Sequence, residues 1–153
     1  MGMKIEGRYE LPAPPQQVWD TILLPEVLRE CIPGCSELEA LNETKYRATI
    51  TTKIGPIKAT FKGQVELAEM DEPNSVVLRG AGEGGIAGFA KGDARIILSQ
   101  GETENSSVLQ YEGDVAIGGK IAQLGSRLVA SVTQKLSDQF FQNLAQRFQV
   151  TAH

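Results

Sequence analysis

The chain has 153 residues, a net charge of −4, a hydrophobic fraction of 41% and a charged fraction of 22%. These values are typical of one soluble globular domain, and the acidic balance does not favour nucleic acid as a partner. The N-terminus lacks the apolar core of a signal peptide, and no run reaches the roughly 18 apolar residues of a membrane-spanning helix. We therefore expect one cytoplasmic domain over residues 3–148, with residues 1–2 a remnant of expression and 149–153 a short tail.

The first predicted elements are a strand and two short helices. Residues 3–11 alternate between apolar and charged side chains, which predicts a half-buried strand. Prolines then mark the starts of two short helices, over residues 15–23 and 25–31, because proline fits the first turn of a helix but not its interior.

A run of antiparallel strands follows. Residues 44–54 and 57–70 flank a Gly-Pro turn whose predicted register places Ile54 opposite Ile57. With that register apolar residues oppose apolar ones on one face, as a sheet with one wet face requires. Three further strands complete the run, with a glycine pair turning the chain between the first two: residues 75–83, 86–99 and 106–117.

The last segment, 120–148, carries apolar residues at spacings of three or four, which predicts one amphipathic helix of about seven turns. On its apolar stripe, Phe140 is favoured over Phe141 as the ring that faces the sheet. The helix is the only predicted element long enough to cover the apolar face of the sheet. The predicted fold class is therefore α+β: a curved antiparallel sheet wrapped around a long C-terminal helix, with two short helices after the first strand.

This order of elements resembles the helix-grip fold of the START-like (SRPBCC) superfamily, which includes lipid carriers, plant pollen allergens and polyketide aromatases. Within it, IPGCSELE at 32–39, KIGPIKATFKGQVEL at 53–67 and GDVAIGGKIAQLGSRLV at 113–129 resemble the family of the carbon monoxide dehydrogenase G subunit. The resemblance implies an accessory protein that recruits a molybdenum hydroxylase to the inner face of the cytoplasmic membrane. It also implies a quinone or other lipophilic ligand in the cavity, with no covalent cofactor.

Two groups of glycines need an interpretation. Gly118-Gly119-Lys120 is followed by Ile121, where a phosphate-binding loop needs Ser or Thr, so we interpret the pair as a tight strand-to-helix turn. Gly125 is expected to let the helix approach the sheet closely.

The second group lies between residues 80 and 92 and has two interpretations. One is a hairpin with bulges. The other is an inner face without side chains, which would open a cavity whose mouth Phe89 plugs.

The candidate ligand-binding residues are those predicted to face this cavity, although each alone is also typical of ordinary core. They are Trp19, Ile50, Phe61, Phe89, Tyr111, Leu128, Val132 and Phe140. A small enzyme of the aromatase or cyclase type, or a lipid-transfer module without a redox partner, remain alternatives to the accessory protein.

No catalytic group is predicted. Glu112 and Asp114 alternate with apolar residues, so they are expected on the outer face of the sheet, paired with Arg95. The only histidine is His153, and with Cys31 and Cys35 alone a zinc site would lack ligands. We expect no metal, and reduced thiols.

Lys53, Lys58 and Lys62 share the predicted outer face of the first hairpin, where Lys53 and Lys58 oppose each other directly. Like charges at opposed positions are unfavourable. The lysines are either a solvated face or a docking patch for anionic lipid headgroups or an acidic partner.

Overall fold

The computed structural model describes the backbone of residues 2–151 and the side chains of residues 2–148. Its strands form a seven-stranded antiparallel sheet in the order β1-β7-β6-β5-β4-β3-β2. They are β1 (Gly2–Leu11), β2 (Cys35–Ala40), β3 (Lys45–Ile54), β4 (Ile57–Asp71), β5 (Ser75–Glu83), β6 (Phe89–Gln100) and β7 (Ser107–Gly118). The helices are α1 (Pro15–Ile22), α2 (Pro25–Cys31) and α3 (Ser126–Thr151), with two 3₁₀ turns, η1 (Gly85–Ala87) and η2 (Lys120–Leu124).

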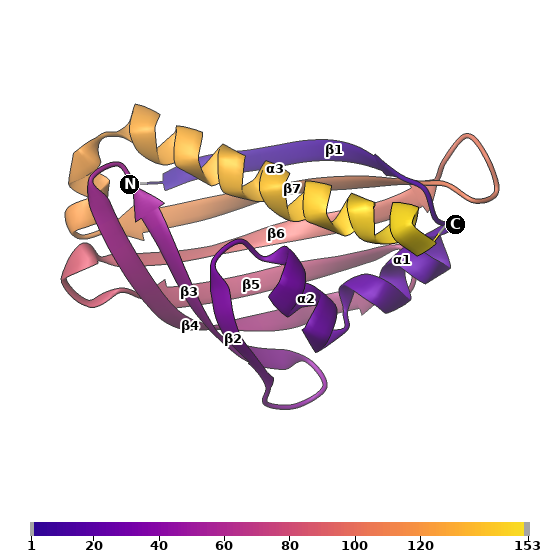
Figure 1. Ribbon diagram of the computed structural model, residues 1–153, viewed down its shortest axis with the longest axis horizontal. Helices are drawn as coiled ribbons and strands as arrows, with labels where there is room; N and C mark the ends of the chain where they lie inside the picture. Colours follow the sequence, from indigo (N-terminus) through magenta and orange to yellow (C-terminus); the bar gives the residue numbers. More distant parts are fainter. Residues whose placement is uncertain (1, 152–153) are drawn as a thin grey trace.

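The predicted α+β architecture is confirmed. Figure 1 shows α3 running along the sheet, from the end where β7 leads into it to the end where α1 lies. The face of the sheet toward α3 is called the inner face here, and the opposite face the outer face. Both short helices begin at the predicted prolines, Pro15 and Pro25.

The first hairpin has the predicted register. Ile54 pairs with Ile57 and Ile50 with Phe61 on the inner face, while Lys53 opposes Lys58 on the outer face. The alternation of apolar and polar residues therefore determined which face each side chain takes.

One strand was not predicted and one begins three residues later than expected, whereas the other strand ends agree with the prediction to within one residue. Residues 35–40 form β2, an edge strand that pairs only with β3. It was not predicted, because its side chains are all exposed or only partly buried and their burial does not alternate. The chain between β5 and β6 makes the turn η1 in place of the start of a strand, so β6 begins at Phe89.

The predicted C-terminal helix is divided at Gly125. This residue has a φ of +101°, and no atom lies within 4 Å of a Cβ placed on it. Gly125 therefore ends η2 and does not serve the close approach to the sheet that we expected. The helix α3 that follows extends to Thr151, past the predicted end at 148, while residues 152–153, including His153, lie outside the described residues.

Two clusters of buried side chains fill the space between the sheet and the helices. The larger one is packed around α1, α2 and the second half of α3, and we call this part the closed half; it includes Leu11, Val18, Trp19, Leu109, Phe141 and Leu144. The smaller one is packed around η1, η2 and the first half of α3, and we call this part the open half; it includes Ile54, Ala87, Ile117, Ile121 and Val129.

Hydrogen bonds to backbone carbonyls fasten the closed half. The buried Ser107 hydroxyl donates to the carbonyl oxygen of Ala13, and the Asn143 side chain on α3 donates to the carbonyl of Cys31 at 2.9 Å. The first bond ties the connection between β1 and α1 to β7, and the second ties α3 to the end of α2, each contributing about 1 kcal/mol.

Candidate functional site: an apolar groove

A groove of about 390 Å³ lies in the open half, between the inner face of the sheet and the first half of α3. Its walls are predominantly aliphatic, with one aromatic ring. They include Ile50, Phe61, Val115, Ile117, Val132 and Leu136. This volume lies within the range of small-molecule sites, which are usually concave and largely apolar.

Glycines form the floor of this groove. Gly63 faces Gly82 across β4 and β5, and Gly80 faces Gly92 across β5 and β6. The pairing of β5 with β6 runs without a shift from Ser75 to Glu83, so these glycines do not mark bulges. The segment is therefore a hairpin, as one interpretation predicts, but without bulges at these glycines, and its inner face is left without side chains, as the other predicts.

The four floor glycines differ in the space around them. A Cβ placed on Gly63 or Gly92 would lie 2.1 Å or 2.6 Å from a backbone oxygen of the neighbouring strand, so a side chain there requires the sheet to move. At Gly80 and Gly82 the nearest atom would be 3.7 Å away, an ordinary contact. Side chains at Gly80 or Gly82 would project into the groove.

Few polar side-chain groups face the groove, and those on α3 already have partners. The Thr133 hydroxyl donates to the carbonyl of Val129 at 2.8 Å, and the Ser137 hydroxyl donates to the carbonyl of Thr133 at 3.0 Å. Lys91 borders the groove through its backbone, because its side chain alternates to the outer face between Ala90 and Gly92. The described residues hold no group of His, Cys, Asp and Glu that could bind a metal ion.

Three of the predicted ligand-binding residues meet in this groove: Ile50 from β3, Phe61 from β4 and Val132 from α3. Leu128 lies close by, at the tip of the first hairpin, where a Cβ on Gly55 would be 2.9 Å from its Cδ2 atom. Leu128 therefore closes the end of the helix over the hairpin and does not line the groove.

The remaining predicted ligand-binding residues lie elsewhere. Trp19 and Tyr111 are buried in the closed half, and Phe140 packs against the same cluster. Phe89 is on the outer face, 46% exposed, with its ring over Gly118. It does not plug the mouth of the groove, so that prediction was wrong.

A stack of aromatic rings forms the edge of the closed half that faces the groove. The ring of Phe141 lies 4.6 Å from that of Tyr9 and 5.0 Å from that of Tyr111, measured between centroids. Phe141 is buried and Phe140 only partly so, which reverses the predicted preference between these two rings. On α3, the groove lining ends at Ser137, about one helical turn before Phe141.

The stack also contains the most strongly shifted titratable group of the site. The Tyr9 hydroxyl donates a hydrogen bond to the carboxylate of Asp138. Burial, and then this hydrogen bond, raise the pKa of Tyr9 well above its ordinary value. The buried Tyr111 hydroxyl has no hydrogen-bond partner within the described part of the chain. The alternation of β1 pointed Tyr9 inward, but no pattern in the sequence indicated its pairing with Asp138.

Outside the groove, the surface ion pairs differ from those expected. Arg95 lies directly opposite Glu112, but its ion pair at 3.3 Å is with Glu69, which also binds Arg79 at 3.0 Å. A register shift after Ala68 explains this arrangement, because it brings Glu69 between the two arginines.

Both cysteines are free, with Cys31 buried and Cys35 partly buried. Burial raises the pKa of each thiol, which disfavours the reactive thiolate. Between residues 2 and 151, none of the helices is long and apolar enough to cross a membrane.

The sheet, the long helix and the groove between them define a START-like, helix-grip domain. A START superfamily protein from Mycobacterium smegmatis has a TM-score of 0.74 at 13% identity, covering 97% of this chain and 98% of that one. The Zhui aromatase/cyclase from Streptomyces sp. R1128 has a TM-score of 0.73 at 10% identity, covering 100% and 97%. At such identities the likeness shows the fold alone.

A conserved protein from Geobacillus kaustophilus is more similar, with a TM-score of 0.90 at 28% identity over 97% of both chains. The sequence matches the family of the carbon monoxide dehydrogenase G subunit (CoxG) over residues 7–149, and the chain belongs to this family. None of the curated proteins matches it in sequence.

Proposed function

We propose that this protein is a ligand-binding accessory protein that holds a lipophilic molecule, such as an isoprenoid quinone, in the groove. The observation that carries the proposal is the glycine floor, because it keeps about 390 Å³ open beneath a helix whose neighbouring half is tightly packed. Aliphatic walls, together with Thr133 and Ser137 hydroxyls that already have partners, favour an apolar ligand over a polar one.

The role of the ligand follows from the family. The family is named for one of the subunits of carbon monoxide dehydrogenase, so an accessory protein of a redox enzyme is the role most in keeping with a bound quinone. We propose a molybdenum hydroxylase as that enzyme, met at the inner face of the cytoplasmic membrane. Lys53, Lys58 and Lys62 are proposed to contribute to docking there.

A cyclase or aromatase would need an acid or base positioned at its substrate. The polar side chains on the inner face of the groove are hydroxyls, from Thr52, Thr133 and Ser137. The groove therefore supports carriage of a ligand better than catalysis, and the choice between redox accessory and lipid-transfer module depends on the partner.

The test is native mass spectrometry of the purified protein, organic extraction of any ligand, and titration with decylubiquinone and a short-chain menaquinone. We expect a bound or added quinone at one per chain. Gly80→Leu should weaken quinone binding at least about tenfold, because its side chain would occupy the groove.

Ala81→Leu is the matched control, since Ala81 adjoins Gly80 but its side chain points to the outer face. Equal quinone affinity of the two variants, or a wild-type protein that takes up neither quinone, would contradict the proposal. The enzyme partner is tested separately, by isolating the protein from its native cells and assaying the co-purified material for molybdenum.

A further inference from the structure

Three segments of the chain meet at one end of the molecule, which we call the basic end: residues 51–62, 83–91 and 116–128. They contain the tip of the first hairpin, the turn η1 and the turn η2, at the left of Figure 1. The three segments are in contact: Lys62 pairs with Glu83 and Phe89 with Gly118 in the sheet, and a Cβ on Gly119 would lie 2.4 Å from the Cα of Gly88. The basic end is therefore one continuous surface.

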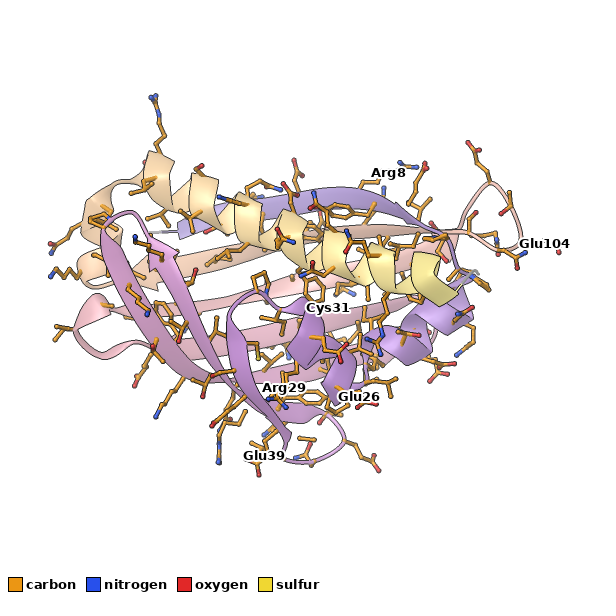
Figure 2. All side chains as sticks on the ribbon, viewed as in Figure 1. Arg8, Glu26, Arg29, Cys31, Glu39 and Glu104 are labelled. Carbon is orange, nitrogen blue, oxygen red and sulfur yellow. The ribbon has the colours of Figure 1, made fainter. Side chains whose placement is uncertain are left out.

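Charge is distributed very unevenly between this end and the rest of the chain. The basic end holds six of the 15 Lys and Arg residues and one of the 19 Asp and Glu residues, Glu83. It therefore carries a formal charge of +5 in a chain whose net charge is −4. The loops 41–44, 72–74 and 101–106 carry four acidic residues and no cation. One of these, Glu104, is labelled in Figure 2 on a loop at the end opposite the basic end.

The cations of the basic end are also left without acidic partners. Of the nine other Lys and Arg residues, six form ion pairs within 4.0 Å, whereas between residues 2 and 148 none of the basic-end cations does. Those cations are Lys53, Lys58, Lys62, Lys91, Lys120 and Arg127. Their charge is available to an external anionic surface.

An aliphatic side chain projects from the same end. Ile86 in η1 is 90% exposed, far more than any other exposed large apolar residue of the described chain. Glycines flank it at Gly84, Gly85 and Gly88, while its neighbour Ala87 is buried and fastens the turn to the open half. The fold thus holds Ile86 out on a short, anchored loop.

We propose that the basic end is a docking surface for an anionic lipid bilayer, with Ile86 inserted among the acyl chains and the six cations against the headgroups. Cations near an anionic membrane and a buried apolar side chain are the two contributions that hold peripheral proteins on a bilayer. The inference rests on the proposed function and deepens it, because Ile54, Ile117 and Ile121 both line the groove and belong to the basic end. A lipophilic ligand would then leave the bilayer close to the groove.

A bilayer fits these features better than an acidic protein surface. A protein partner binds through a central, well-packed patch that is usually rich in aromatic residues. The basic end instead presents one projecting aliphatic side chain, with cations spread over three segments and Phe89 set on the outer face at 46% exposure. An interfacial membrane anchor needs no complementary pocket.

The test compares binding of the full chain to vesicles of phosphatidylcholine alone and of phosphatidylcholine with about 30% phosphatidylglycerol. We expect binding to the anionic vesicles only, weakening as salt is raised. Ile86→Asp should lower that affinity about tenfold or more, while Ile97→Asp, at an exposed apolar residue on the outer face of β6, should leave it unchanged. Equal binding of these two variants, or a wild-type chain that does not bind anionic vesicles, would overturn the proposal.

The cations are tested in the same assay. Replacing Lys53, Lys58 and Lys120 together by Gln should lower the affinity by about fivefold for each lysine, whereas replacing Arg8, Arg29 and Lys135 should have little effect. If the two triple variants lose similar amounts of vesicle affinity, the chain is attracted to anionic lipid by its cations in general and not through the basic end, and the proposal is overturned.

Insertion is read out separately with Ile86→Trp. The native Trp19 is only 3% exposed, so a blue shift and quenching by brominated lipid would come from the new indole. Ile97→Trp should show neither effect, and an unquenched Ile86→Trp would overturn insertion. Quinone titration of Ile86→Asp without vesicles separates the two proposals. We expect this variant to keep its quinone binding and to lose its vesicle binding. A wild-type chain that binds anionic vesicles but no quinone would contradict the proposed function alone.

Discussion

The closed and open halves of the domain share the same strands and the same helix, but their inner faces carry side chains of very different size. In the closed half, strands β4 to β7 point large residues inward: Leu67, Val76, Ile96, Leu98, Leu109 and Tyr111. In the open half, β4 to β6 point Gly63, Gly80, Gly82, Ala90 and Gly92 inward. The groove therefore results from omitted side chains and does not require the helix to separate from the sheet.

Because of this difference, the two halves contribute unequally to the stability of the domain and to the space available for a ligand. Burial of large apolar side chains in the closed half supplies most of the stability, at roughly 25 cal/mol per Å² of apolar area. The open half contributes less and keeps space for a ligand. Substitutions along α3 should therefore have effects that depend on which half they fall in.

The largest expected effect comes from one substitution made in both halves of α3. Leu144 is fully buried in the closed half, so Leu144→Ala should lower the free energy of unfolding by about 2–5 kcal/mol. Leu136 is partly buried on the wall of the groove, so Leu136→Ala should cost about 1 kcal/mol or less. Denaturant unfolding of the two variants measures the difference, and equal losses would mean that the groove is packed in solution.

A smaller effect is expected at the break between η2 and α3. Gly125→Ala should lower stability by about 1–3 kcal/mol, all of it from the backbone, since φ is +101° and the added methyl group meets no atom within 4 Å. Gly85→Ala is the control: it has equal space and a φ of +62°, near the left-handed region that costs other residues less. An unaffected Gly125→Ala would mean that η2 and α3 join into one continuous helix.

The smallest effect is expected at the aromatic stack on the groove-facing edge of the closed half, where Tyr9→Phe removes the hydrogen bond to Asp138 at a cost of about 1 kcal/mol. The pH dependence is the sharper measurement. Because the pKa of Tyr9 is raised in the folded state, the unfolded chain loses this proton first as pH increases. The stabilisation is fully present below the unfolded pKa of about 10 and is lost as pH rises beyond it.

The stability of the wild-type chain should therefore fall more steeply than that of Tyr9→Phe between about pH 9.5 and 11.5. Unfolding at matched denaturant concentrations across this range compares the two slopes. Parallel slopes would show that Tyr9 titrates alike in the folded and unfolded chains.

The fold was predictable wherever side chains alternate between two unlike environments. In the first hairpin, the alternation of apolar and polar residues along both strands predicted the register between them. The prolines predicted where α1 and α2 begin. The edge strand β2 was missed because it has little to bury, and an exposed strand carries no alternation.

The site was only partly predictable, because face assignments depend on turn lengths that the sequence does not reveal. A two-residue turn after Glu83 would place Phe89 opposite Gly80, whereas the observed connection places it opposite Glu83. A change of three residues in pairing moves a side chain to the other face. Phe141 was missed for a different reason: α3 packs against α2 as well as the sheet in this half, so its buried surface is wider than one stripe.

The unequal space around the floor glycines has a consequence for how this fold could diversify. Mutations at Gly63 or Gly92 would disturb the sheet itself, so selection is expected to reject them. Gly80 and Gly82, together with the residues of α3 that face them, accept change without moving a strand. Evolved variants of this protein would therefore acquire new ligand preferences through a few substitutions at these positions. The closed half would maintain the stability of the domain while the groove changes.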